Sequence, residues 1–426
     1  MLLILRHRSF LSTEVFAEMK RVVITGMSLV SSLGHTPDDA YNRLHTFENC
    51  VEYQPDLEVY DKLTTKLAAR IKDFKIPEHF TRKVTRSMGT VAIYSVACTE
   101  EALKDARLFG DDIIISGKTG VSYGSSSGSL DAIMDFYSMS VNHEVKNLNS
   151  GSYVKMMPQT TAVNISVYFK TTGRLIPSST ACTSGSMGIG AAYEAIKHGQ
   201  QTVMIAGGAE EYHPTQVAVF DTLYATSSKN DAPKSTPSPF DKDRDGLVIG
   251  EGAGTLILEE YEHAKARGAK IYAEIVGYAT NTDGTHITNP NAETMAIVMQ
   301  KALEDAKISA DEIGYVNAHG TATLQGDIAE SQATAKVFNR QVPVSSIKSY
   351  TGHTLGACGA IETILSVKML QNGWFCPTLN LKNIDSECGE LDYITGKGKN
   401  LDTNLIMTNN FAFGGINTSL ILKKFD

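Results

Sequence analysis

The sequence is poor in cysteine and in net basic charge and has no long apolar run, and each scarcity excludes a class of protein. Its six cysteines are dispersed over 426 residues without a CxxC pair, which fits neither a disulfide scaffold nor a zinc site. No apolar stretch approaches the roughly 20 residues that a membrane-spanning helix needs. We therefore expect free thiols, a cytoplasmic location and no membrane span.

Basic residues are outnumbered by acidic ones, with 39 Lys and Arg against 47 Asp and Glu. Binding of nucleic acid requires a basic face that neutralises phosphates, so we expect no nucleic-acid partner. Two glycine-rich stretches also fail as nucleotide motifs. "SGKTG" at 116–120 has Asp112 where a phosphate loop needs its first glycine, and "GEGAGTLILEE" leads into a strand instead of a helix. We expect no cofactor and no metal.

The chain reads as two similar series of alternating strands and helices. "RVVITGMSLV" is a strand expected to end at Gly26, "GTVAIYSVACTEEALKDA" is a helix, and a related series restarts near residue 271. We predict an α/β protein with an N-terminal half over 19–268 and a C-terminal half over 269–426. Residues 1–18 lack a secretory cleavage site and contain two glutamates, so we interpret them as a leader or extension.

Two stretches place a reactive side chain before a helix rich in glycine and alanine. These are "STACTSGSMGIGAAYEAIKHG", with Cys182, and "SYTGHTLGACGAIETILSVKM", with His353. Backbone N–H groups and the positive dipole end at a helix start stabilise a thiolate, which predicts that Cys182 is a nucleophile. The alternative is a buried structural cysteine, but the hydroxyls of Thr180, Thr183 and Ser184 disfavour a purely apolar pocket. The pairing predicts two helix N-termini at one active site.

Two histidines stand apart from the other nine. His319 in "NAHGTATLQGD" and His353 in "KSYTGHTLGACG" each follow a strand-like segment beside glycine and threonine, a composition that lets a thin substrate pass. Lys348 and Glu362 flank His353 in the sequence. A buried Lys–Glu pair could orient a histidine, whereas an exposed pair would contribute little, and the spacing does not decide between them.

Five motifs together resemble a known family: "TACTSGS", "PFDKDRDGLVIGEGAG", "HGTATLQGD", "KSYTGHTLGACGAIE" and "NNFAFGGIN". In this order, across residues 19–426, they are similar to the elongating, type II β-ketoacyl-acyl-carrier-protein synthases, the Cys-His-His condensing enzymes of the thiolase superfamily. The resemblance implies a five-layered α-β-α-β-α sandwich of two pseudo-repeated halves. It also implies a homodimer, or a heterodimer with a ketosynthase-like subunit, that uses substrates carried on the phosphopantetheine of acyl carrier protein.

The resemblance further assigns roles in an acyltransferase reaction. Cys182 would hold the acyl chain as a thioester, and His319 and His353 would stabilise the enolate formed when malonyl-carrier protein loses CO2. Lys348 would orient His319, with Glu362 as its counter-ion. The backbone at Cys182 and Phe413 would form the oxyanion hole. The other implied residues are Phe411, Phe413 and Gly414 for gating, Thr321 and Thr323 for the pantetheine arm, and Arg82, Lys83, Arg86 and Lys229 for docking of the carrier protein.

Several positions depart from the family pattern. Ala412 replaces a glycine of the gating loop, which predicts less freedom for Phe413. Leu324 and Ile416 replace a common proline and threonine. Ser127 replaces a bulky aliphatic residue of the acyl pocket, which favours a longer, more polar or unsaturated chain, as in polyene or polyketide pathways, while fatty acid biosynthesis remains the other expected pathway.

Three other functions remain as alternatives. A biosynthetic thiolase would need a second catalytic cysteine where this chain has Phe413. An initiating synthase would use Cys-His-Asn. A chain-length factor, which is a weak or inactive partner of another ketosynthase, would lack the nucleophile.

Overall fold

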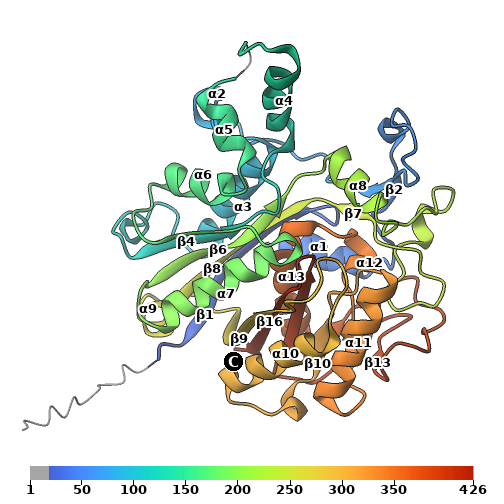
Figure 1. Ribbon diagram of the computed structural model, residues 1–426. Helices are drawn as coiled ribbons and strands as arrows, with labels where there is room; N and C mark the ends of the chain where they lie inside the picture. Colours follow the sequence, from blue (N-terminus) through green and yellow to red (C-terminus); the bar gives the residue numbers. More distant parts are fainter. Residues whose placement is uncertain (1–18, 147, 426) are drawn as a thin grey trace, which may run out of the picture.

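The computed structural model describes residues 19–146 and 148–425 (Figure 1). The expected leader at 1–18 lies outside the described residues. Strands of the two halves join into one eleven-stranded sheet in the order β13-β11-β10-β15-β16-β9-β1-β8-β6-β4-β5. The halves meet where β1 pairs with β9 over only three residues, Val22 to Ile24, so two sheets share a short seam.

The two halves have the same strand order. The N-terminal half contains β1 (Val22–Ser31), β4 (Thr119–Gly124), β5 (Leu175–Ser178), β6 (Val203–Glu210) and β8 (Gly252–Glu260). The C-terminal half contains β9 (Ala273–Thr282), β10 (Tyr315–Asn317), β11 (Pro343–Ser345), β15 (Leu405–Ala412) and β16 (Ile416–Lys424), with β13 (Asp392–Tyr393) at its edge. In each half the first strand lies beside the fifth, followed by the fourth, second and third. The pseudo-repeat expected from the sequence is confirmed, whereas its boundary at 268/269 stays a prediction.

Helices complete five layers around the two sheets (Figure 1). The central layer consists of α7 (Ser184–Lys197) and α13 (Cys358–Asn372), which contact each other and both sheets. One outer layer contains α3 (Thr90–Asp105) and α6 (Thr160–Phe169), and the other contains α10 (Ala292–Ala306) and α11 (Leu324–Phe338). The thiolase-like sandwich is therefore the observed fold.

Glycines let the two central helices approach closely at their N-terminal ends. A Cβ on Gly185 would lie 2.9 Å from the carbonyl oxygen of Gly356, and a Cβ on Gly359 would lie 2.6 Å from the backbone nitrogen of Ser186. Larger residues at either position would push the helices apart. The small-residue motifs around Cys182 and His353 thus bring the two helix starts together.

Shorter elements surround this core. The helices are α1 (Pro37–Leu44), α2 (Arg82–Thr85), α4 (Ile133–Asn142), α5 (Ser150–Met156), α8 (Pro214–Asp221), α9 (Tyr261–Ala266) and α12 (Lys348–Thr351). Two small sheets contain β2 (Glu52–Tyr53), β3 (Leu67–Ala69) and β7 (Ile249–Gly250), and β12 (Trp374–Phe375) and β14 (Lys399–Asn400). Among the described residues, none of the helices combines the length and apolarity that crossing a membrane requires.

The expected end of the first strand at Gly26 is wrong. Strand β1 continues to Ser31 and is buried along its whole length. Its pairing with β8 shifts register between Ile24 and Gly26, and a Cβ on Gly26 would lie 2.4 Å from the carbonyl oxygen of Ala102 in α3. The glycine accommodates a helix packed on the sheet and does not terminate the strand.

Candidate active site

Cys182 lies in a tight turn at the entrance to α7. The preceding Ala181 has a φ of +50°, a left-handed conformation that costs free energy for a residue with a Cβ. The hydroxyl of Ser184 spans the turn: it accepts the N–H of Thr180 at 2.9 Å and donates to the carbonyl of Ala181 at 2.7 Å. This turn holds the thiol at the interface of the two halves.

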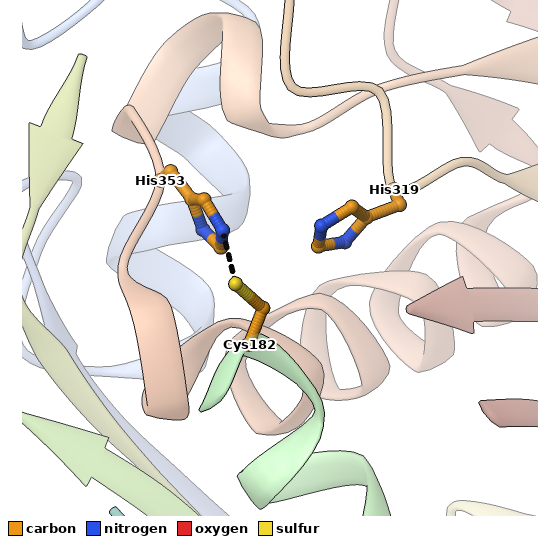
Figure 2. A group of neighbouring side chains, drawn as sticks. All are labelled: Cys182, His319 and His353. Atoms are coloured by element: carbon orange, nitrogen blue, oxygen red, sulfur yellow. Dashed lines mark hydrogen bonds between the residues drawn. The ribbon is translucent and has the colours of Figure 1, made fainter. Parts of the chain in front are cut away.

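The structure brings Cys182, His319 and His353 together, as the sequence predicted (Figure 2). All three are buried, and their sulfur and ring-nitrogen atoms lie within 4.8 Å of one another. His353 Nε2 is 2.9 Å from Cys182 Sγ, and the two imidazole centroids are 5.1 Å apart at an angle of 87°. The second half supplies both histidines, on loops that follow β10 and α12.

The hydrogen bonds at Nδ1 set the tautomer of each histidine. Nδ1 of His353 accepts the backbone N–H of Leu355 at 3.2 Å, and Nδ1 of His319 accepts from Lys348 Nζ at 3.1 Å and from the amide of Asn410 at 3.3 Å. Burial, and then the charge of Lys348, hold the pKa of both imidazoles well below 6.5. A neutral imidazole that accepts at Nδ1 carries its proton on Nε2. Both rings are therefore hydrogen-bond donors toward the site, and neither offers Nε2 as a base.

The expected thiolate at Cys182 is wrong for the resting protein. Burial raises the pKa of the Cys182 thiol to about 12, although Lys348 and the backbone N–H groups of Phe413 and Cys182 oppose the rise. Desolvation penalises the charged form more than these donors favour it. The thiol form prevails at neutral pH, and the nucleophile must lose its proton during the reaction.

This protonation state predicts how Cys182 reacts with iodoacetamide. The sign follows from the raised pKa: the thiolate fraction increases with pH until the pH passes about 12. We expect the alkylation rate at Cys182, followed by peptide mass spectrometry, to rise about tenfold per pH unit between pH 7 and 9. A plateau near pH 7 would show that the resting residue is already a thiolate.

Lys348 and Glu362 form a buried pair behind His319, not an exposed one. Lys348 Nζ lies 2.5 Å from Glu362 Oε1, and both side chains are at most 2% exposed. Burial lowers the pKa of Lys348, but Cys358 and Glu362 outweigh it, so that the net shift is upward and the ammonium stays charged. Asn410 donates to the other Glu362 oxygen at 2.8 Å. The pair thus fixes the donor that sets the His319 tautomer.

Breaking this pair should destabilise the fold. In Lys348→Met the carboxylate of Glu362 loses its counter-ion while it remains buried, and we expect the free energy of unfolding, measured in urea, to fall by about 3–5 kcal/mol. The double variant Lys348→Met/Glu362→Gln removes both charges and should recover part of that loss. A single variant as stable as the wild type would contradict the expected role of the pair.

Phe413 lies in the loop between β15 and β16, beside the nucleophile. Its backbone N–H and that of Cys182 both lower the pKa of the Cys182 thiol, so both face the sulfur and suit the donors of an oxyanion hole. Its ring packs against Phe220 at 5.2 Å between centroids. Gly414 and Gly415 have φ values of +90° and +69°, so the conformational freedom of the loop rests on them.

Ala412 ends a strand in the structure, and the restriction that it places on Phe413 stays a prediction. Ala412 pairs with Ile416 as the last residue of β15, an ordinary extended position that any residue can adopt. Phe411, one residue earlier, is buried and packs at 6.3 Å from the His319 ring. The hinge therefore begins after Ala412.

Two cavities meet at Cys182 and Phe413. The first, about 450 Å³, contains the two histidines together with Thr321 and Thr323, whose hydroxyls are 2.8 Å apart. Its lining also includes the charged residues Arg244 and Asp245. The second, about 230 Å³, continues on the other side of Phe413 and includes the predicted pocket residue Ser127. A polar carrier arm suits the first cavity, and an apolar chain suits the second.

The predicted docking residues do not form one cluster of free charges. Arg82, Lys83 and Arg86 are exposed on or beside α2, and within 19–146 and 148–425 they have no ion pair. Lys229 is partly buried, pairs with Asp245 at 3.4 Å and donates to the carbonyl of Asp243. Lys229 is thus engaged within the protein, next to Asp245, which lines the first cavity.

The sequence did not predict the roles of three residues near the site, which are Asn410, Arg244 and Glu210. Asn410 lies inside the quoted "NNFAFGGIN" motif, but the motif does not reveal its contacts with His319 and Glu362. Arg244 donates to the carbonyls of Thr323 and Leu324 and pairs with Asp385 at 2.7 Å, which holds the pantetheine-side loop. Glu210 ends a buried strand, and a sequence pattern alone does not show what a buried carboxylate contacts.

Comparison with known proteins adds a family to this geometry. Residues 19–264 match the family "Beta-ketoacyl synthase, N-terminal domain" and residues 272–382 match its "C-terminal domain". The 3-oxoacyl-[acyl-carrier-protein] synthase 2 of Vibrio harveyi is 38% identical over 415 residues, covering 95% of this chain and 99% of that protein.

Solved structures agree with the family matches. A β-ketoacyl synthase from Burkholderia phymatum STM815 is 55% identical, with a TM-score of 0.94 over 96% of this chain and all of that one. A ketosynthase of a type II PKS, in complex with its acyl-carrier protein and bound to a hexaketide, is 29% identical, with a TM-score of 0.85 over 96% of this chain and all of the other.

Proposed function

The chain belongs to the β-ketoacyl synthase family, and from that premise we propose how its residues divide the reaction of an elongating 3-oxoacyl-acyl-carrier-protein synthase. The enzyme condenses malonyl-carrier protein with an acyl chain and lengthens the chain by two carbons. One observation carries the assignment: both histidines present Nε2–H donors around a buried cysteine. Incubation with acyl- and malonyl-carrier protein should release CO2 and give a β-ketoacyl product by mass spectrometry. If neither CO2 nor a β-ketoacyl product formed, the proposal would be contradicted.

In the first stage the acyl chain moves to Cys182. Sγ attacks the carbonyl carbon of the carrier thioester, and the oxygen becomes an oxyanion that the N–H groups of Cys182 and Phe413 stabilise. The C–S bond to pantetheine then breaks, and its thiolate takes the proton that Cys182 loses. The exchange is proton-neutral overall, which fits a thiol of raised pKa and requires no base among the histidines.

In the second stage malonyl-carrier protein loses CO2 in the first cavity. The C–C bond to the carboxylate breaks, and its electron pair forms an enolate whose oxygen accepts the Nε2–H groups of His319 and His353. The enolate carbon attacks the acyl carbonyl, and the bond to Cys182 Sγ breaks to leave the β-ketoacyl product and a Cys182 thiolate, which takes one proton from water to regenerate the thiol. Thr321 and Thr323 would hold the pantetheine arm. No cofactor enters this scheme.

An acyl carrier protein is the proposed partner, and the basic residues at α2 are its proposed dock. The acyl carrier proteins that serve this family are acidic, so the exposed basic side chains at α2 should steer their approach. Charge reversal in Arg82→Glu/Arg86→Glu should raise the KM for acyl-carrier protein roughly tenfold at low salt, with kcat little changed. The effect should shrink as salt screens the charges.

A matched control is Lys301→Glu on α10, at the opposite end of the molecule from α2 (Figure 1). It changes one charge with the same sign and should leave the KM unchanged. If α2 variants behaved like this control, the dock would have to be placed elsewhere.

A homodimer is the proposed assembly, with a ketosynthase-like heterodimer as its alternative. Strand β5 is the edge of the large sheet, and Leu175 on it is 42% exposed, so its backbone groups could pair with a second chain. Sedimentation of the purified chain distinguishes a self-dimer from a subunit that needs a different partner. A cytoplasmic location stays a prediction.

The alternatives fit the site less well. A thiolase would need a second cysteine in the loop that carries Phe413, and Cys376 and Cys388 do not line either cavity at Cys182. A chain-length factor would lack the nucleophile and its histidine donors, which are assembled in this chain.

A further inference from the structure

The second cavity has one wall that is polar by sequence. Ser126, Ser127, Thr215 and Gln216 line it together with the aliphatic and aromatic side chains of Leu130, Val219, Phe220, Leu355 and Phe413. Serine hydroxyls in an acyl pocket would suggest a chain that carries oxygen. The contacts of these hydroxyls decide whether that reading is correct.

Glu210, at the end of β6, is fully buried and gathers those hydroxyls. Its Oε1 accepts the hydroxyls of Ser125 and Ser127, each at 3.0 Å. Its Oε2 accepts the backbone N–H and the hydroxyl of Ser126, the former at 2.7 Å. The same Oε2 accepts the N–H of Gly356 at 3.1 Å. Each of these five groups donates, so the carboxylate is their common acceptor.

The remaining polar groups on the wall are also engaged within the protein. Ser127 Oγ accepts from Gln216 Nε2 at 3.1 Å, while Gln216 Oε1 accepts the backbone N–H of His213. The Thr215 hydroxyl lies 2.7 Å from His213 Nδ1, which also accepts the N–H of Thr215. The hydroxyl hydrogens of this wall therefore point into the protein and away from the cavity.

We propose that Glu210 is a specificity-determining residue, because it draws the hydroxyls of Ser126 and Ser127 out of the acyl pocket and makes a wide pocket that offers the chain no hydroxyl hydrogen. The small serines supply width, and the carboxylate removes their polarity. The pocket then suits an apolar acyl chain, saturated or unsaturated, and rejects an unreduced chain with a keto oxygen near the thioester. This assignment rests on the proposed function, since it concerns the chain held on Cys182.

A keto oxygen entering such a pocket loses its hydrogen bonds to water and gains none from the serine or threonine hydroxyls. An unpaired polar group in an apolar environment costs free energy, and sites discriminate strongly when a polar group is left without a partner. The β-keto product of this enzyme must therefore be reduced by another enzyme before it can return as a primer. The expectation contrasts with the related ketosynthase structure that holds a hexaketide.

The decisive comparison is the rate at which Cys182 is acylated by two carrier-bound primers of equal length, octanoyl and 3-oxooctanoyl. Intact-protein mass spectrometry follows each adduct. We expect octanoyl to react at least tenfold faster in the wild type, and Ser126→Ala/Ser127→Ala to keep that ratio within about twofold. Glu210→Gln should free the hydroxyls and lower the ratio at least fivefold. Adding both serine changes to Glu210→Gln should restore it.

Several outcomes would overturn the proposal. A wild type that accepts both primers equally, or an alanine double variant that selectively loses 3-oxooctanoyl, would show hydroxyls serving the ligand. If folded Glu210→Gln kept the wild-type ratio of octanoyl to 3-oxooctanoyl acylation rates, the Glu210 carboxylate would not determine the specificity. If Glu210→Gln does not fold, the serine double variant alone decides. Failure of the proposed function would give a different result from failure of this proposal, because Cys182 would then form no octanoyl adduct at all.

Discussion

Replacing Cys182 by alanine is expected to abolish condensation, lowering the rate of β-ketoacyl product formation by roughly 10⁴-fold or more. The variant has no atom that can hold the acyl chain, although it keeps the cavities and both histidine donors. The fold should survive because the cysteine side chain loses only one buried sulfur. Product formation is measured by mass spectrometry with octanoyl- and malonyl-carrier protein as substrates.

Cys358→Ala provides the matched control. Cys358 is also buried and lies in the same layer, where its thiol donates to the Cys182 carbonyl at 3.2 Å, but it has no proposed covalent role. This variant should form the acyl adduct at Cys182, as the wild type does. Condensation that persists in Cys182→Ala and disappears in Cys358→Ala would move the nucleophile to Cys358.

Replacing His319 by leucine is expected to separate the two stages. The enolate loses one of its two donors, which should lower malonyl decarboxylation and condensation by about 10²–10³-fold. Acylation of Cys182 should stay within about fivefold of the wild type, because the backbone N–H groups of Cys182 and Phe413 stabilise the first oxyanion. Single-turnover acylation and steady-state CO2 release measure the two stages independently.

His319→Gln tests whether donation is the property that matters. A glutamine amide carries N–H donors but cannot act as a base near neutral pH, so it should recover part of the activity that the leucine variant loses. Equal loss of both stages in His319→Leu would argue that His319 supports the fold of the site instead of the enolate. If His319→Gln acylated Cys182 normally but recovered no condensation activity, His319 would act by proton transfer and not by hydrogen-bond donation.

The architecture could be predicted from the sequence because its periodic signals are local. Strand and helix patterns repeat in both halves, and the glycines in the first turns of α7 and α13 indicate the close approach that Gly185 and Gly359 make in the structure. Gly26 misled the strand prediction, since a glycine that makes room for a helix looks the same in sequence as one that ends a strand.

The composition of the site was predictable, but its electrostatics was not. Motifs identified Cys182, His319, His353 and the Lys348–Glu362 pair, which the fold unites from distant segments. The thiol pKa depends on desolvation by both halves, whereas the sequence shows only the helix start that opposes it. The role of Glu210 depends on contacts with a loop more than 80 residues away in the chain, a relation that periodicity does not encode.

The most direct measurement of the central claim is the intact mass of the protein after incubation with acyl-carrier protein, followed by addition of malonyl-carrier protein. The wild type should gain one acyl group, localised to Cys182 by peptide mapping, and lose it as the β-ketoacyl product appears. Cys182→Ala should gain none. An adduct on another residue, or an adduct that malonyl-carrier protein does not consume, would contradict the assignment of Cys182, His319 and His353 as a condensing centre.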